Sequence, residues 1–159
     1  MYSIRLATLD DAGIIAGHRH RMFLGMGKYD PQKLEVMTSA YRPWLESKMA
    51  ADEYLGWLAT TADGSVAAGA GLWLMDWPPH VIGTGLRRGN IINVYTEPAH
   101  RRRGLARQLL NAALDWCRTN GVDVIILHAS KEGRHLYESV GFEPTNEMRL
   151  LLNFPTSEN

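Results

Sequence analysis

The residues with the clearest chemical potential are four arginines around one glycine, between a predicted strand and a predicted helix. The segment reads Arg101-Arg102-Arg103-Gly104-Leu105-Ala106-Arg107. The first backbone N–H groups of a helix lack internal partners and lie at the positive end of its dipole, so they can bind an anion. Glycine leaves the main chain open to close approach, and arginine can hold phosphate oxygens with paired hydrogen bonds. The segment predicts a phosphate-binding turn. Charge alone leaves open a solvated basic loop before a helix.

Two elements must position this turn. The preceding segment Ile91–Thr96 is rich in β-branched and aromatic residues and predicts a strand, which Glu97-Pro98 ends because proline gives no N–H to a ladder. From Leu105 onward the apolar residues recur at helical spacing. Asn120-Gly121 supplies a left-handed cap that ends this helix. The order is therefore strand, tight basic turn, helix.

The rest of the chain alternates between predicted strands and helices. Further strands are expected at Ser3–Ala7, Tyr54–Thr60, Val66–Met75, Val122–His128, Phe142–Pro144 and Met148–Leu152. Further helices are expected from Thr8 to about Met22, from Asp30-Pro31 through a segment that Pro43 must kink or divide, and between Ser130 and Gly141. A long loop runs from Asp76 to Gly89.

These elements predict an α/β (α+β) fold. Strand, crossover helix and strand imply a parallel pair joined right-handedly, here Ile91–Thr96 and Val122–His128. We expect a single mixed, largely antiparallel sheet of about seven strands around this central pair, flanked by about four helices. A chain of 159 residues is expected to form one domain, residues 1–159.

Composition excludes several classes of protein. Seventeen basic residues balance seventeen acidic ones, so no global field favours nucleic acid or an anionic membrane. The lone Cys117 cannot form an internal disulfide, which fits a reducing cytoplasm. The first residues lack the apolar core of a signal peptide, and the apolar run Val66–Met75 is too short to span a bilayer. We expect a soluble cytoplasmic protein.

Two motifs resemble one family. Arg101-Arg102-Arg103-Gly104-Leu105-Ala106 is similar to the (Gln/Arg)-x-x-Gly-x-(Gly/Ala) signature of the GNAT superfamily, the acetyl-CoA-dependent N-acetyltransferases. Leu136-Tyr137-Glu138-Ser139-Val140-Gly141-Phe142 is similar to that family's Leu-Tyr-Glu-x-x-Gly-Phe element. The two lie at the family's usual distance, and Asn90 to Phe142 covers about a third of the chain.

The resemblance implies an acyltransferase that moves the acetyl group of acetyl-CoA directly to a primary amine of a small molecule or peptide, with no covalent enzyme intermediate. It implies that Tyr137 protonates the departing thiolate, or at least hydrogen-bonds to it. An N–H near Val94 or Tyr95 could polarise the thioester carbonyl. The cofactor-binding residues it implies are Val94, Tyr95, Thr96, Arg101, Arg102, Arg103, Gly104, Leu105, Ala106, Arg107, Ser130 and Arg134.

The sequence departs from the family in two places. Ser130 and Gly133 stand where many members carry asparagine and alanine. The strand Ile91–Thr96 has Asn93 within it and Asn90 before it, but no carboxylate before Glu97, where members often place a glutamate base. The base is therefore unassigned, and the candidates are a solvated base or one of Glu97, Asp76, His80 and His128.

The sequence does not identify the acyl acceptor either. Arg87-Arg88 in the long loop could hold a carboxylate of an amino-acid-like acceptor. The residues that suggest an apolar, aromatic wall are Met22, Met26, Tyr29, Met37, Tyr41, Trp44, Trp73 and Trp77, although an ordinary core explains most of them.

Other sequence patterns give less information about function. Cys117 next to Trp116 is better explained by core packing than by a nucleophile. The six histidines include no His-x-x-x-His pair, so we predict no metal. Two alternatives to an enzyme are a non-catalytic acyl-CoA-binding or interaction domain of the same fold and, with less support, a nucleotide- or RNA-binding module. We expect no nucleic acid or membrane partner; a homodimer is suggested only by analogy with such families.

Overall fold

The computed structural model describes residues 1–153 of the chain. These residues divide between two compact units, one over Met1–His128 and one that begins at Ala129. The single domain expected over residues 1–159 stays a prediction.

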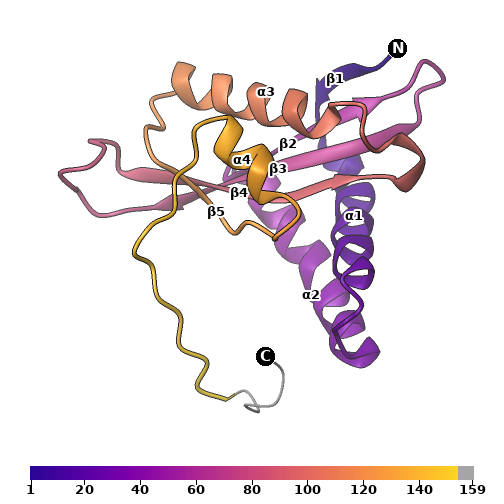
Figure 1. Ribbon diagram of the computed structural model, residues 1–159, viewed down its shortest axis with the longest axis horizontal. Helices are drawn as coiled ribbons and strands as arrows, with labels where there is room; N and C mark the ends of the chain where they lie inside the picture. The colour runs from indigo at the N-terminus through magenta and orange to yellow at the C-terminus, as the bar shows by residue number, and fades with distance from the viewer. Residues whose placement is uncertain (154–159) are drawn as a thin grey trace. The chain divides into compact units, whose positions relative to one another are not determined.

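The first unit is built on a five-stranded sheet with the order β1-β2-β3-β4-β5 (Figure 1). The strands are β1 (Ser3–Leu6), β2 (Tyr54–Thr60), β3 (Val66–Asp76), β4 (Arg87–Thr96) and β5 (Ile125–Leu127). The first four pair antiparallel, and β4 pairs with β5 in parallel, with Ile91 opposite Leu127. The predicted parallel pair and mixed sheet are therefore confirmed.

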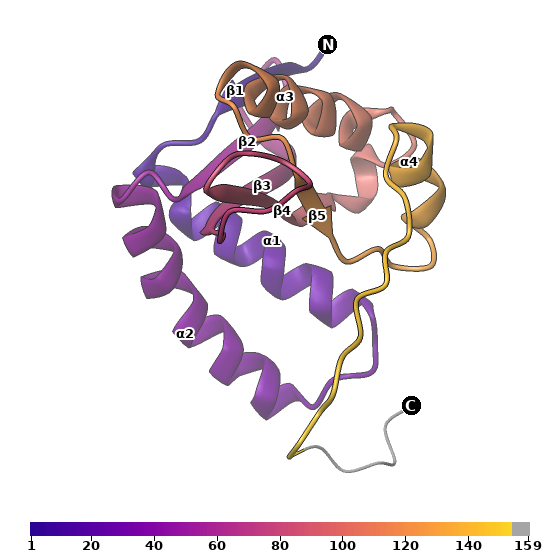
Figure 2. The same ribbon diagram turned by 90° about the vertical axis from the view of Figure 1, so that its left-hand side faces the viewer.

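Helices cover both faces of this sheet. Helix α3 (Leu105–Thr119) lies on one face, and α1 (Ala12–Gly25) and α2 (Pro31–Ala50) lie on the other, as the two perpendicular views show (Figures 1 and 2). Short 3-10 turns, η1 (Leu9–Asp11) and η2 (Pro98–His100), precede α1 and α3. On the α1/α2 side, a buried core joins the two helices to β2; it includes Ile15, Leu45 and Leu58.

Helix α3 follows its sequence pattern closely. Its buried residues are Leu105, Leu109, Leu110, Ala113, Leu114 and Cys117. The left-handed residue Gly121, with φ 69°, ends the helix, and the Val122 N–H donates to the Cys117 carbonyl at 3.0 Å. Because this cap uses the Val122 N–H, β5 starts at Ile125 rather than at Val122 as expected.

The second unit contains α4 (Arg134–Ser139). The Gly141 N–H donates to the Glu138 carbonyl at 3.1 Å and the Phe142 N–H to the Tyr137 carbonyl at 3.1 Å, with Gly141 at φ 104°. This pair of bonds is the Schellman motif, in which a left-handed glycine ends a helix. The predicted C-terminal cap at Gly141 is therefore confirmed.

The prediction of about seven strands is wrong: the described residues form five. Phe142–Pro144 and Met148–Leu152 have no strand partner within residues 1–153. The Phe142 N–H is used by the helix cap, and Pro144 has no N–H to donate, so only the Glu143 N–H of the first segment is left to donate to a ladder.

Of the two outcomes expected at Pro43, a kink or a division of the helix, the division does not occur, since α2 is continuous from Pro31 to Ala50 with Pro43 inside it. Proline removes one intrahelical hydrogen bond. Buried Leu34 and Tyr41 precede Pro43 and buried Leu45 follows it, so tertiary packing holds both halves of the helix.

A β-bulge interrupts β4. Gly69 pairs with Tyr95 and Gly71 with Ile92, so two residues of β4, Asn93 and Val94, oppose one residue of β3. Asn93 has φ 57°, a left-handed conformation that asparagine tolerates better than most residues. A bulge leaves its extra residue outside the ladder and re-aims the side chains around it.

Gly71 makes room for a side chain that reaches this bulge. A Cβ on Gly71 would lie 2.0 Å from the Tyr54 hydroxyl oxygen, because the Tyr54 ring crosses over β3 at this point. We expect Gly71→Ala to lower the free energy of unfolding by about 1–3 kcal/mol, the usual cost of overpacking a core. Gly25→Ala is the matched control, since its Cβ would have no heavy atom within 4 Å. Chemical denaturation measures both; equal stability of the two variants would contradict the expectation.

Candidate functional site

The basic turn between β4 and α3 has the geometry of an anion site. Gly104 is the N-cap of α3, with φ 75°, and no side chain caps the helix. The first N–H groups of a 15-residue helix are therefore left to a ligand or solvent. A Cβ on Gly104 would meet no heavy atom within 4 Å, so the space beside the main chain is open. The predicted strand–turn–helix arrangement is confirmed.

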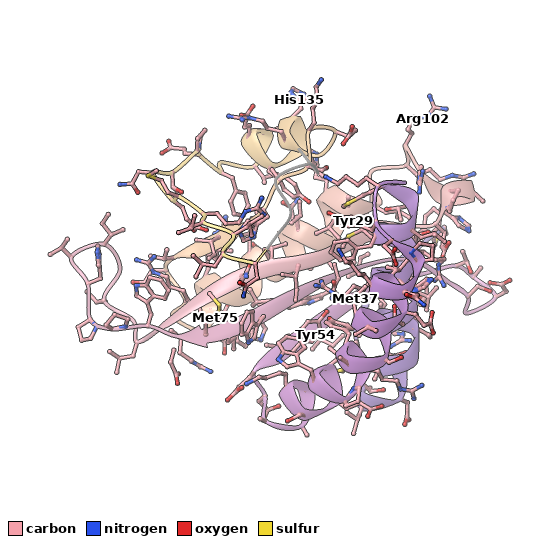
Figure 3. All side chains as sticks on the ribbon, turned by 90° about the horizontal axis from the view of Figure 1, so that it is seen from below. Tyr29, Met37, Tyr54, Met75, Arg102 and His135 are labelled. Carbon is pink, nitrogen blue, oxygen red and sulfur yellow. The ribbon has the colours of Figure 1, made fainter. Side chains whose placement is uncertain are left out.

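The arginines of the turn lie on its outside. Arg101, Arg102, Arg103 and Arg107 are exposed. The Arg101 Nε donates to the Thr96 carbonyl at 3.2 Å, and Arg102 has the positive φ of 59°. Figure 3 shows Arg102 projecting outward from the turn. These cations flank the helix N-terminus in the sequence and are open to solvent.

The other predicted contact residues next to the turn differ in exposure. Leu105 is buried, so only its main chain can reach a ligand, and Ala106 is half-buried. The predicted strand residues Val94, Tyr95 and Thr96 follow the bulge at Asn93. Tyr95 turns its ring into the protein, 5.1 Å from the His18 ring. Val94 has no partner in the pairing of β3 with β4, a main-chain irregularity of the kind that can present an N–H to a ligand.

A polar network holds the bulge in place, and sequence reasoning missed it. The Asn93 side-chain amide donates to the hydroxyls of Tyr41 and Tyr54. Its carbonyl oxygen accepts from Arg19 Nη1 at 2.8 Å. Asn93 is 5 % exposed, and burial raises the pKa of both tyrosines. Figure 3 shows Tyr54 on the α2 side of the sheet, near Met37. The available signal was a short polar side chain inside an otherwise buried strand.

Glu97 lies in a second cluster, at the end of β4. Its carboxylate accepts from Arg21 Nη2 at 2.7 Å and from the Tyr95 hydroxyl at 3.3 Å. The His18 Nε2 lies 3.7 Å from the same carboxylate. The Glu97 carboxylate is therefore already engaged by Arg21 and Tyr95.

His18 is held neutral by its surroundings. It is 2 % exposed, and burial, aided by the positive charge of Arg21, lowers its pKa to about 4. The unfolded chain binds a proton near the ordinary value of 6.5, so native stability is full above pH 6.5 and falls as the pH drops toward 4. A shift of this size corresponds to about 3 kcal/mol.

We therefore expect His18→Gln to flatten the decline of unfolding free energy between pH 7 and pH 4.5. His135→Gln is the control, because His135 is exposed and projects outward (Figure 3). Urea denaturation at several pH values measures the slope. A slope in His18→Gln as steep as that of the wild type would exclude His18 as its source.

In the second unit, Ser130, Gly133 and Tyr137 form one local cluster. The Ser130 hydroxyl accepts from the Gly133 N–H at 3.1 Å. A Cβ on Gly133 would lie 3.0 Å from the Tyr137 ring and 3.2 Å from the Ser130 hydroxyl, so glycine suits this tight turn. Burial raises the pKa of Tyr137, which keeps the phenol protonated at neutral pH. Within residues 129–153, its hydroxyl has no hydrogen-bond partner. Arg134 pairs with Glu138 at 2.6 Å.

The remaining candidates are scattered over the first unit. Asp76, His80 and His128 are exposed, and the His80 Nδ1 accepts from the Ile82 N–H at 2.9 Å. The Arg88 guanidinium lies 4.0 Å from the centre of the Trp77 ring, so it stacks on that ring. Nothing in this arrangement favours one of these groups as a base.

Cys117 is fully buried, and burial raises the pKa of its thiol to about 11. Such a thiol is a poor nucleophile, so the packing interpretation is confirmed.

Within residues 1–153, no three His, Cys, Asp or Glu side chains gather as metal ligands. No helix in this part of the chain combines the length and the apolar character that crossing a membrane requires.

Comparison with known proteins identifies the family. A model of the acetyltransferase (GNAT) family matches residues 26–142. This match spans more than half of the chain, so the chain belongs to the GNAT family of acetyltransferases. The resemblance of the two motifs is thereby confirmed. A search among curated proteins finds no match.

Solved structures agree with this assignment. A GCN5-related N-acetyltransferase from Ralstonia eutropha JMP134 is similar with a TM-score of 0.89 and 34% identity, over 96% of this chain and 99% of that one. A predicted acetyltransferase with acetyl-CoA from Clostridium acetobutylicum has a TM-score of 0.86 and 27% identity, over 96% of both chains. Ribosomal-protein-alanine N-acetyltransferase from Brucella melitensis biovar Abortus 2308, with a TM-score of 0.69 and 20% identity over 98% of this chain and 100% of that one, shows a similar fold.

Proposed function

We propose that this protein is an N-acetyltransferase that transfers the acetyl group of acetyl-CoA directly to a primary amine of a small molecule or peptide. The observation that carries the proposal is the uncapped N-terminus of α3 at Gly104, surrounded by arginines. Membership of the GNAT family supports it, as does the acetyl-CoA complex of the similar Clostridium protein.

The residues around the turn fit a coenzyme diphosphate. The N–H groups of Gly104, Leu105, Ala106 and Arg107 would donate to its oxygens, and Arg101, Arg102 and Arg103 would add positive charge. The main chain of Val94, Tyr95 and Thr96 would hold the pantetheine arm. The family resemblance assigns Ser130 and Arg134 to coenzyme binding as well. Acetyl-CoA supplies the activated acyl group, and the protein supplies orientation and charge stabilisation.

Transfer from an ammonium substrate removes two protons from nitrogen and supplies one to sulfur. The ammonium loses the first proton before its nitrogen attacks the thioester carbonyl, and the nitrogen loses the second as the tetrahedral intermediate expels the thiolate and becomes the amide. The base stays unassigned among solvent, Glu97, Asp76, His80 and His128. An N–H at the bulge, near Val94 or Tyr95, would stabilise the oxyanion that forms. Tyr137 would donate its phenolic proton to the departing thiolate, or a hydrogen bond to it.

The decisive test measures free thiol released from acetyl-CoA with a panel of amines, amino acids and peptides. We expect thiol release that depends on the amine. Binding without turnover would favour the alternative of a non-catalytic acyl-CoA-binding domain. Thermal shift reports binding separately, because a ligand at a hundred times its dissociation constant stabilises the folded state by about 2.7 kcal/mol.

We place the protein in the cytoplasm, with no nucleic acid, membrane or metal among its partners. The single buried cysteine supports a reducing compartment, and the balanced charge argues against a nucleic-acid surface. A homodimer is suggested by analogy with such families.

A further inference from the structure

Two buried side-chain atoms within residues 1–153 have no hydrogen-bond partner: Arg19 Nε and Asn90 Oδ1. One is a donor on a cation, and the other is a neutral acceptor. A buried polar atom without a partner is destabilising, so each is a candidate for a ligand contact.

Arg19 is a cation without a counter-ion in the described part of the chain. Its neighbour on α1, Arg21, pairs with Glu97 at 2.7 Å, and Arg5 pairs with Asp11 at 2.8 Å. No carboxylate of residues 1–153 lies within 4.0 Å of the Arg19 guanidinium. Its charge meets the faces of Tyr41, at 4.6 Å, and Phe23, at 5.0 Å. A half-buried charge of this kind favours an anionic ligand.

The orientation of the guanidinium is fixed. Nη1 donates to Asn93 Oδ1 at 2.8 Å, and the two aromatic rings lie against the guanidinium. The opposite edge, with Nε and Nη2, has no hydrogen-bond partner within residues 1–153. That edge carries two parallel N–H groups, the arrangement that matches the two oxygens of a carboxylate.

Asn90 lies on the same side of the sheet. It is directly opposite Trp73 in β3, which in turn is opposite Tyr54 in β2, and residues directly opposite in a sheet share a face. The Trp73 ring packs on Trp44 of α2, with 5.3 Å between ring centres. Tyr54 bonds to Asn93, which holds Arg19. Asn90 and Arg19 therefore both belong to the α1/α2 side of β4, and Asn90 precedes the bulge residue Asn93 by three positions.

The two unpaired atoms match the two ends of an amino acid. We propose that the acyl acceptor is a primary amine that also carries a carboxylate, with Arg19 binding the carboxylate and Asn90 Oδ1 accepting a hydrogen bond from the amine. This inference rests on the proposed function and names the substrate class of the same site. Asn90 orients the amine but cannot act as its base, because an amide oxygen does not take up a proton at neutral pH.

The test compares thiol release for phenylalanine and the other common amino acids with that for their amides and decarboxylated amines. We expect wild-type kcat/KM to favour the carboxylate form at least 10-fold, because tenfold corresponds to about 1.4 kcal/mol and hydrogen bonds to charged groups contribute at least that much. Arg19→Met should abolish this preference. Arg19→Lys should keep only part of it, because lysine lacks the paired N–H groups that bind both oxygens of a carboxylate. Arg21→Met, two residues away on α1, is the matched control and should retain the preference.

Several results would overturn the assignment. One is equal turnover of amino acids and their amides by the wild type. Another is a wild-type preference for phosphoethanolamine over amino acids. A third is a preference for the carboxylate form that Arg88→Met loses and Arg19→Met retains. If Arg19→Met does not fold, the comparison of wild type with Arg19→Lys tests the assignment, because the preference for the carboxylate form should be smaller in Arg19→Lys.

Binding separates this inference from the proposed function. If no amine is turned over, but phenylalanine raises the melting temperature of the CoA-saturated wild type and not of Arg19→Lys, the carboxylate site stands and catalysis fails. If amines without a carboxylate are turned over equally well, catalysis stands and the carboxylate site fails. If the protein shows no turnover and phenylalanine gives no stabilisation, both the proposed function and the carboxylate site are rejected.

Discussion

Gly104→Val is expected to lower the affinity for coenzyme A at least 100-fold. Gly104 has φ 75° at the N-cap of α3, a conformation in which a β-branched residue is strained. The valine side chain would also occupy the open space beside the main chain. Loss of two hydrogen bonds to a diphosphate, at about 1.5–3 kcal/mol each, accounts for the expected effect. Isothermal titration calorimetry with coenzyme A measures the change.

The control for this variant is Gly121→Val. Gly121 has φ 69° at the opposite end of α3, and its Cβ would also have no heavy atom within 4 Å. Both variants should lose stability to similar backbone strain, of about 1–2 kcal/mol. Gly121→Val should bind coenzyme A like the wild type. Similar affinity loss in both variants would mean that strain, and not the anion site, weakens binding.

Tyr137→Phe is expected to lower kcat about 100-fold or more and to change KM for acetyl-CoA less than 3-fold. General acid catalysis contributes about 10²–10⁴-fold, and phenylalanine removes only the hydroxyl. Within residues 129–153 that hydroxyl has no hydrogen-bond partner, and the ring packs edge-on against Phe142, with 6.1 Å between ring centres. The fold should therefore tolerate the change. Steady-state kinetics of thiol release give both constants.

Two controls accompany the Tyr137 variant. Its melting temperature and its affinity for coenzyme A should equal those of the wild type, so that a loss of rate reports on chemistry. A kcat near the wild-type value would remove Tyr137 from the acid role. A rise in KM with unchanged kcat would indicate a binding role instead.

Local patterns predicted most of the elements well. Tyr54–Thr60 is a strand with the bounds that its composition predicts, and α3 buries the face that its apolar spacing predicts. Left-handed glycines at Gly104, Gly121 and Gly141 lie where the helix ends require them. These features depend on interactions between residues close in sequence, which a single sequence reports directly.

Features that depend on long-range pairing were missed. The bulge at Asn93 arises from the register of β4 against β3, and its network joins Asn93 to Tyr41, Tyr54 and Arg19. No local pattern encodes these partners. The same limit explains the two strands predicted after Gly141, because an extended segment becomes a strand only where a partner strand accepts its hydrogen bonds.

The basic turn at Gly104 illustrates both cases. Its glycine and its helix were predicted from sequence, whereas the uncapped state of the helix and the outward position of Arg102 required the structure. The assignment of the turn to a coenzyme depended on the similarity of two motifs to one family. Physical reasoning from the residues identified an anion site and no particular anion.

The most direct test is a crystal structure of the protein with coenzyme A, in which the distances from the diphosphate oxygens to the backbone nitrogens of residues 104–107 are measured. We predict at least two distances within hydrogen-bonding range, about 2.7–3.2 Å. A coenzyme whose diphosphate lies elsewhere, with these amides bound to solvent or to side chains, would contradict the proposed site.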